Sequence, residues 1–99
     1  MHMADGYARI TGRPAVGIFT GGPGFSNAIS ALPAIYTSES PVIFVAGAAE
    51  MPEKGMSAFQ EIDQIGMTTP VTKGSWLIHE TTRIPEFVAT AFRTATTGR

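Results

Sequence analysis

Two short apolar runs, the first followed by a glycine-rich break, constrain this 99-residue chain more than any other feature. The runs cover 15–20 and 41–46, and the Gly-Gly-Pro-Gly sequence at 21–24 interrupts regular structure between them. The second run does not alternate polar with apolar residues, which is typical of a strand buried on both faces of a parallel sheet. A strand, a helical pattern and a second strand within about 30 residues predict a βαβ unit. We therefore expect an α/β fold with a mostly parallel sheet and flanking helices.

Apolar residues recur at helical spacing in three further segments, 3–10, 25–36 and 81–97, which predicts three helices. Gly12 is expected to end the first helix, because glycine adopts the left-handed conformation that terminates many helices. Pro33 is expected to kink the second helix, because it removes one backbone hydrogen bond. These helices supply the layers that a parallel sheet needs on its faces.

The region between the second strand and the last helix has weaker patterns. We expect a long loop over 47–60, a short helical turn over 61–67 and an extended segment over 71–78. Few strands are then available to cover a central parallel strand, so we expect marginal stability for the chain alone. The chain starts and ends within helical patterns, so we expect residues 1–99 to be a partial domain truncated at both ends.

Composition narrows the classes of partner. A formal net charge of −1, from 7 Lys and Arg against 8 Asp and Glu, gives no basic surface for nucleic acid or an anionic membrane. The longest apolar run, 41–49, is far shorter than the roughly 20 residues of a membrane span. Cysteine is absent, and His2 and His79 are isolated in the sequence, so we expect no metal site in this chain. We expect a cytoplasmic protein without nucleic-acid or membrane partners.

The ends of the two predicted strands are the candidate ligand site. In open parallel sheets, ligands bind beyond the carboxyl ends of the strands, here at 20–27 and 47–60. Glycines let a ligand approach the backbone closely, and the helix start that follows them offers unpaired N–H groups. Gly22, Gly24 and Asn27 match a dinucleotide-binding fingerprint only in part, because Asn27 replaces its third glycine. A dinucleotide site and a plain strand-to-helix turn therefore both remain open on this motif.

Several segments occur together in an order that is similar to thiamine diphosphate-dependent enzymes. They are His2-Met-Ala-Asp-Gly-Tyr-Ala-Arg9, Thr11-Gly-Arg-Pro14, Thr20-Gly-Gly-Pro-Gly-Phe-Ser-Asn27, Ala58-Phe-Gln-Glu-Ile-Asp-Gln64 and Pro70-Val-Thr-Lys73. The chain most resembles the acetolactate synthase-like group, with benzaldehyde lyase-like members near. The resemblance spans the whole chain and implies that residues 1–99 are part of the N-terminal pyrimidine-binding (Pyr) domain, which has a flavodoxin-like three-layer fold.

The resemblance implies roles for particular residues. In this family a loop lines the aminopyrimidine ring of thiamine diphosphate, and the residues of this chain that resemble it are Thr20, Gly22, Pro23, Gly24 and Asn27. Gln60 resembles a glutamine that reaches the reaction centre, which makes it the candidate catalytic residue, and Phe59 resembles its neighbour on the substrate side.

The resemblance also implies the reaction and the partners. Such enzymes are homo-oligomers, dimers or tetramers, that decarboxylate or ligate 2-keto acids and aldehydes, and some relatives also bind FAD. The magnesium ion that accompanies the cofactor belongs to a diphosphate-binding domain outside this chain. The family's catalytic glutamate precedes the segment that matches His2–Arg9, so we expect the chain alone to be inactive. A dinucleotide-binding half-domain and a remnant without function are the alternatives.

Overall fold

The computed structural model describes residues 1–49, 55–56 and 59–98. The expected loop over 47–60 therefore lies partly outside the described residues. No helix among the described residues is both long and apolar enough to cross a membrane. The elements are α1 (His2–Thr11), β1 (Ala15–Phe19), α2 (Pro23–Ile29), α3 (Leu32–Thr37), β2 (Val42–Ala46), α4 (Gln64–Thr68), the 3₁₀ turns η2 (Thr69–Val71) and η3 (Thr81–Arg83), and α5 (Ile84–Thr96).

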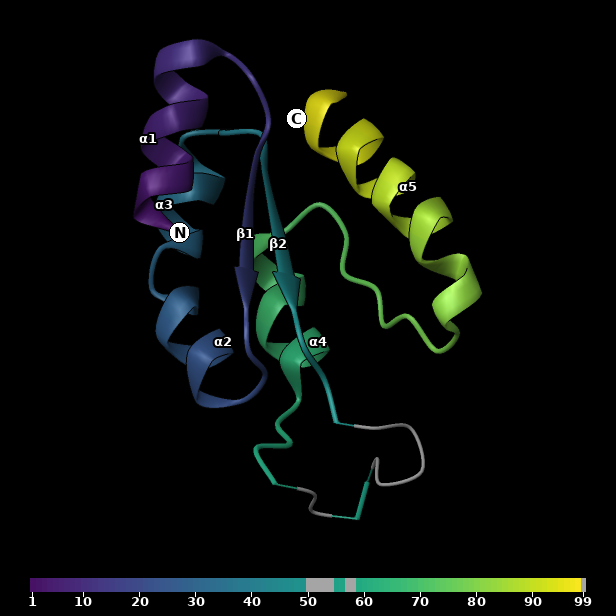
Figure 1. Ribbon diagram of the computed structural model, residues 1–99. Helices are drawn as coiled ribbons and strands as arrows, with labels where there is room; N and C mark the ends of the chain where they lie inside the picture. The colour runs from purple at the N-terminus through teal and green to yellow at the C-terminus, as the bar shows by residue number, and fades with distance from the viewer. Residues whose placement is uncertain (50–54, 57–58, 99) are drawn as a thin grey trace.

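The sheet of the described residues consists of β1 and β2, which pair in parallel. Ala15 lies opposite Val42, and Phe19 lies opposite Ala46. Helices α1, α2 and α3 lie on one side of the two strands and α5 lies on the other (Figure 1). The expected α/β class, with a parallel sheet flanked by helices, is confirmed.

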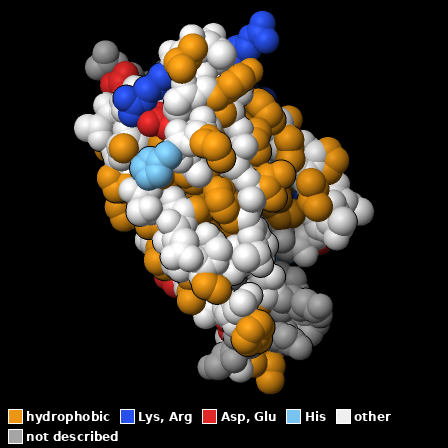
Figure 2. Space-filling view, turned by 60° about the vertical axis from the view of Figure 1, so that its left-hand side comes forward, with side chains coloured by type: hydrophobic (Ala, Val, Ile, Leu, Met, Phe, Trp, Pro, Cys, Tyr) orange, Lys and Arg blue, Asp and Glu red, His pale blue; other side chains and the backbone are white. Residues whose placement is uncertain are grey.

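Helix α1 follows the sequence pattern closely. It ends as expected at Gly12, which has a φ of 66° and donates its N–H to the carbonyl oxygen of Ala8 at 2.9 Å. Its apolar face is turned outward, because the side chains of Met3 and Ile10 are 89% and 87% exposed. Figure 2 shows hydrophobic side chains at the surface on the side of the molecule that carries α1 to α3.

The prediction of a single kinked helix over 25–36 is wrong. The chain forms two helices, α2 and α3, separated at Ser30 and Ala31. Pro33 lies in the first turn of α3, where its missing N–H leaves no hydrogen bond unmade. The helix therefore breaks and restarts before the proline, which avoids the clash that proline causes inside a helix.

The prediction that the second strand is buried on both faces is also wrong within this chain. Ile43 is buried, but Val45 is 41% exposed. The physical reason is a shortage of neighbours, because β2 pairs only with β1 in the described part of the chain, where no residue of α5 is buried. On the covered face, the Phe44 ring stacks on Phe25 and meets Phe19 edge-on, with both centroid distances at 5.1 Å. This aromatic group joins the sheet to α2.

The region after β2 contains less regular secondary structure than expected. The helical turn predicted over 61–67 is present as α4, but it begins only at Gln64 because Asp63 caps it. The Asp63 carboxylate accepts the N–H of Gly66 at 2.9 Å, which satisfies one of the unpaired donors of the helix start. Residues 72–80 follow an irregular path and form no described strand. The last predicted helix is confirmed as α5, with Pro85 in its first turn.

Candidate functional site

A tight corner connects the end of β1 to the start of α2. Gly22 lies at this corner with a φ of 61° and a ψ of −115°, a conformation that residues with a side chain rarely adopt. Pro23 follows at the start of α2, where its fixed φ suits the first helical turn. The Gly-Pro sequence thus sets a sharp change of direction at the carboxyl edge of the sheet.

Gln60 lies against Gly22, although the two residues are far apart in the sequence. A Cβ atom placed on Gly22 would lie 2.6 Å from both the Cβ atom and the carbonyl oxygen of Gln60. Gln60 itself has a φ of 65°, so it turns the chain sharply at this contact. The structure therefore brings together the corner and the candidate catalytic glutamine.

The side chain of Gln64 holds the two strand ends together. Its Oε1 atom accepts the N–H of Gly22 at 3.1 Å, and its Nε2 atom donates to the carbonyl oxygen of Gly47 at 2.8 Å. Gly47 follows β2 directly, and its own N–H donates to the carbonyl oxygen of Phe19 at 3.0 Å. One amide therefore spans the carboxyl ends of both strands.

The other predicted site residues surround this corner to different degrees. Thr20, Pro23 and Asn27 are exposed, and Gly24 lies close to the side chain of Thr20. Phe59 is 90% exposed, so its side chain packs against little of the described chain. Gly24 and Asn27 also line a shallow hollow of about 320 Å³ between α2 and the start of the chain. Its other lining residues are Met1, His2, Phe19, Ala28, Ser30 and Ala31.

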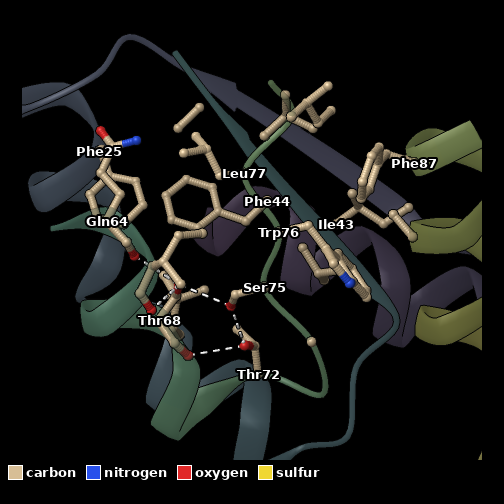
Figure 3. Close-up of a pocket in the computed structure, with 18 of the residues that line it drawn as sticks. Phe25, Ile43, Phe44, Gln64, Thr68, Thr72, Ser75, Trp76, Leu77 and Phe87 are labelled. Atoms are coloured by element: carbon tan, nitrogen blue, oxygen red, sulfur yellow. Dashed lines mark hydrogen bonds between the residues drawn. The ribbon is translucent and has the colours of Figure 1, made fainter. Parts of the chain in front are cut away.

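A broad open groove of about 2390 Å³ runs along the sheet and is lined by residues of α3, α4, α5 and the segment 72–79 as well as the strands. Gln60 and Gln64 both line it. Figure 3 shows Gln64 there together with aromatic and aliphatic side chains. Three hydroxyls form a chain on its wall, since Ser75 Oγ lies 3.0 Å from Thr68 Oγ1 and 2.9 Å from Thr72 Oγ1. This hydroxyl chain ties the irregular segment after η2 to α4.

Asp5 is a buried acid on α1. Its carboxylate accepts hydrogen bonds from Arg9 at 2.9 Å and from Ser40 at 2.6 Å. These bonds, the one from Arg9 first, lower the pKa of the Asp5 carboxyl below its ordinary value. Arg9 also donates to Ser38, so the pair fastens α1 to the connection between α3 and β2. The contacts give Asp5 a structural role.

The family profile described as "Thiamine pyrophosphate enzyme, N-terminal TPP binding domain" matches residues 1–67. Thiamine pyrophosphate is another name for thiamine diphosphate. The chain belongs to this family.

Its relatives narrow the class to the acetolactate synthase-like group. The chain is 42% identical over 98 residues to an acetolactate synthase of Arthrospira platensis, and 40% identical over 99 residues to the large subunit of acetolactate synthase isozyme 3 of Escherichia coli (strain K12). A probable acetolactate synthase large subunit of Methanocaldococcus jannaschii is 42% identical over 98 residues. The matches cover 99% to 100% of the chain but only 17% of each relative.

Sequence reasoning missed the bridging role of Gln64. Gln64 ends a polar cluster that follows the long loop, but nothing in that pattern indicates a bridge between the strands. Only the parallel pairing of β1 with β2 places Gly22 and Gly47 within reach of one side chain. The role depends on contacts that sequence spacing does not reveal.

Proposed function

We propose that this chain supplies the aminopyrimidine-binding side of a thiamine diphosphate site in an acetolactate synthase-like enzyme. The observation that carries the proposal is the contact between Gly22 and Gln60 at the carboxyl edge of the parallel sheet. Ligand sites of open parallel sheets form at this edge. The family match, which includes both residues, supports the same assignment.

The chemistry of the corner fits a neutral ring better than a phosphate. Residues 20–27 carry no charged side chain, and the corner offers backbone groups, the hydroxyl of Thr20 and the amide of Asn27. Such groups suit hydrogen bonds to ring nitrogens. A diphosphate at a helix start needs free backbone N–H groups, but Pro23 has none and the N–H of Gly22 already bonds Gln64. This argument favours an aminopyrimidine over the dinucleotide alternative.

Each proposed residue has a part in holding the ring. Backbone groups of Gly22 and Gly24 and the side chains of Thr20, Pro23 and Asn27 would line it. When bound, thiamine diphosphate acts as the electron sink for cleavage or formation of a carbon–carbon bond next to a carbonyl. Gln60 would orient a carbonyl or alkoxide near the cofactor, because an amide both donates and accepts hydrogen bonds without a change of charge. Phe59 would contact the substrate beside it.

The proposed reaction is decarboxylation or ligation of 2-keto acids by a full-length homo-oligomeric enzyme. Because the chain spans 17% of its relatives, this activity needs the remainder of such an enzyme, including the residues that bind magnesium. We expect the 99-residue chain by itself to release no carbon dioxide from pyruvate. Release of carbon dioxide by the purified chain would contradict this part of the proposal.

The test is replacement of Gln60 in the full-length enzyme that carries these residues. Gln60→Ala and Gln60→Gly both remove the amide, and glycine also accommodates the positive φ at this position. We expect carboligation to fall about tenfold or more, the typical effect of losing one positioned hydrogen-bonding group, while the melting temperature changes little. Thr69→Ala is the control, because Thr69 is exposed and its hydroxyl donates to the carbonyl oxygen of Ile65 within its own helical region.

Two results would overturn the assignment. One is equal loss of folded protein and of activity in both Gln60 variants, which would make the residue structural. The other is calorimetric titration of the full-length protein in which NAD binds and thiamine diphosphate does not, which would favour the dinucleotide alternative.

A further inference from the structure

Gln64 makes the only described side-chain contact that reaches the backbone at both strand ends. Its amide accepts from Gly22 N–H at 3.1 Å and donates to the Gly47 carbonyl at 2.8 Å. The ladder between β1 and β2 closes just before this point, at the bond between Gly47 N–H and the Phe19 carbonyl. Beyond that bond, Gln64 takes over the connection between the two strands.

The N–H of Gly22 needs this partner because Gly22 is buried. A buried N–H without a partner costs free energy, and the Gln64 oxygen satisfies the one on Gly22. Gly22 also touches the backbone of Gln60, so a shift of the corner would displace both residues. The orientation of the Gly22–Gln60 pair is therefore linked to the side chain of Gln64.

Gln64 is itself held firmly at its base. It is the first residue of α4, directly after the Asp63 cap. One turn later, Thr68 is buried, and its hydroxyl bonds the carbonyl of Gln64 at 2.9 Å. Figure 3 shows Gln64 extending from α4 toward Phe25. A side chain anchored in this way can fix the position of the groups it bonds.

We propose that Gln64 is a positioning residue that holds the Gly22–Gln60 pair in the geometry needed to receive the aminopyrimidine ring. The effect on the cofactor rests on the proposed function, whereas the bridge between the strand ends does not. Only a group that donates and accepts at once can serve here, because one partner is an N–H and the other a carbonyl. An amide meets this requirement at every pH near neutrality.

The test compares Gln64→Met, Gln64→Glu and the control Met67→Leu in the full-length enzyme. Methionine has a similar length but makes neither bond, while Met67 lies on the same helix, is 42% exposed and is not part of the bridge. The first readout is hydrogen exchange of the peptide containing Gly22, measured without cofactor. The second is the dissociation constant of thiamine diphosphate.

For Gln64→Met we expect exchange at Gly22 to accelerate about tenfold, the effect of losing roughly one hydrogen bond. We expect the dissociation constant of thiamine diphosphate to rise by about the same factor. Both quantities should stay within about twofold of the parent in Met67→Leu, as for an exposed site away from the contact. Accelerated exchange without any binding of thiamine diphosphate by the parent enzyme would refute the proposed function and leave the bridge standing.

Gln64→Glu supplies a signature that a general loss of stability would not give. An ionised carboxylate repels the Gly47 carbonyl, which displaces the side chain from the bridge and so weakens its bond to Gly22 as well. A protonated carboxyl donates and accepts as the amide does. Exchange at Gly22, corrected for its intrinsic pH dependence, should therefore slow toward the parent value as the pH falls. This comparison also serves if Gln64→Met fails to fold. Unchanged exchange at Gly22 in Gln64→Met, or no return of protection at lower pH in Gln64→Glu, would overturn the proposal.

Discussion

At the scale of single residues, Gly22 occupies a position that both its backbone conformation and its neighbours restrict. Its φ of 61° disfavours any side chain, and the space where a Cβ would lie is filled by Gln60. Two independent constraints, backbone conformation and packing, thus require glycine at the same place. This is the residue at which a small change should have the largest local effect.

We predict that Gly22→Ala lowers the free energy of unfolding by about 1–3 kcal/mol, from strain and close contact together. Gly6→Ala is the matched control, since Gly6 lies within α1 and a Cβ there meets nothing within 4 Å. The control should raise stability by roughly 0.5–1 kcal/mol, because alanine favours helix. Urea unfolding of both variants measures the difference. Equal effects of the two substitutions would contradict the conformational argument.

Asp5 makes stability depend on pH in the acidic range. Its pKa is lower in the folded chain than the ordinary value of 3.8, mainly because Arg9 and Ser40 donate hydrogen bonds to it. The resulting stabilisation is complete above the ordinary pKa and is lost as the pH falls through the lower, folded value. We predict that Asp5→Asn unfolds with a smaller dependence on pH below 3.8 than the parent. Urea unfolding across this range measures it, and an unchanged slope would contradict the prediction.

The sequence predicted those single residues whose role depends only on their own backbone conformation. Gly12 and the corner around Gly22 were predictable because glycine has few competitors at such backbone angles. The bridge by Gln64 was not predictable, because its two partners become neighbours only after β1 and β2 pair. The approach of Gln60 to Gly22 was predictable in part, because 20–27 and 47–60 follow the carboxyl ends of the two predicted strands. Their particular contact was not.

At the scale of elements, the short helix α4 depends strongly on its cap. It has five residues, too few to be stable by helix propensity alone. The Asp63 carboxylate satisfies the N–H of Gly66 and thereby fixes where the helix begins. Because Gln64 follows the cap directly, the start of α4 also sets the position of the bridge.

We predict that Asp63→Ala lowers the free energy of unfolding by about 0.5–2 kcal/mol, the usual effect of losing an N-terminal cap. Asp63→Asn keeps a side-chain acceptor and should remain within a few tenths of a kcal/mol of the parent. Chemical denaturation followed by circular dichroism measures both. The cap would be shown to be unimportant if alanine and asparagine had the same effect.

The sequence predicted the positions of helices and strands well where the pattern of apolar residues is local. It predicted less well where a helix ends within a continuous apolar pattern. Both strands and the first and last helices were correctly placed from apolar spacing and turn residues. The break between α2 and α3 was missed because periodicity continues through Ser30 and Ala31. Pro33 correctly indicated an interruption of the helix, but it lies at the start of a new helix and not at a kink.

At the scale of the whole molecule, the chain leaves much apolar surface uncovered. Large hydrophobic side chains on β1, β2 and α5 are exposed, among them Ile18 at 76% and Val88 at 44%. The groove along the sheet is lined by apolar residues of the strands, α3 and α5. A chain of this length with so few buried residues has a small hydrophobic contribution to stability.

We predict that the 99-residue chain alone has a free energy of unfolding below about 5 kcal/mol, the low end for native domains. Its thermal transition, followed by circular dichroism, should be broad, and the dye ANS should bind to the exposed apolar surface. The full-length enzyme should show neither property to the same degree. A sharp cooperative transition of the chain without dye binding would contradict this prediction.

The parallel pairing of Ala15 with Val42 has a consequence for how the chain folds. Parallel neighbours cannot meet through a tight hairpin, so the whole connection through α2 and α3 must be closed first. Loop-closure entropy is lost before the ladder and the bond between Asp5 and Ser40 can compensate for it. Contact order, more than helix propensity, should therefore set the folding rate, and the folding nucleus should include both ends of this loop.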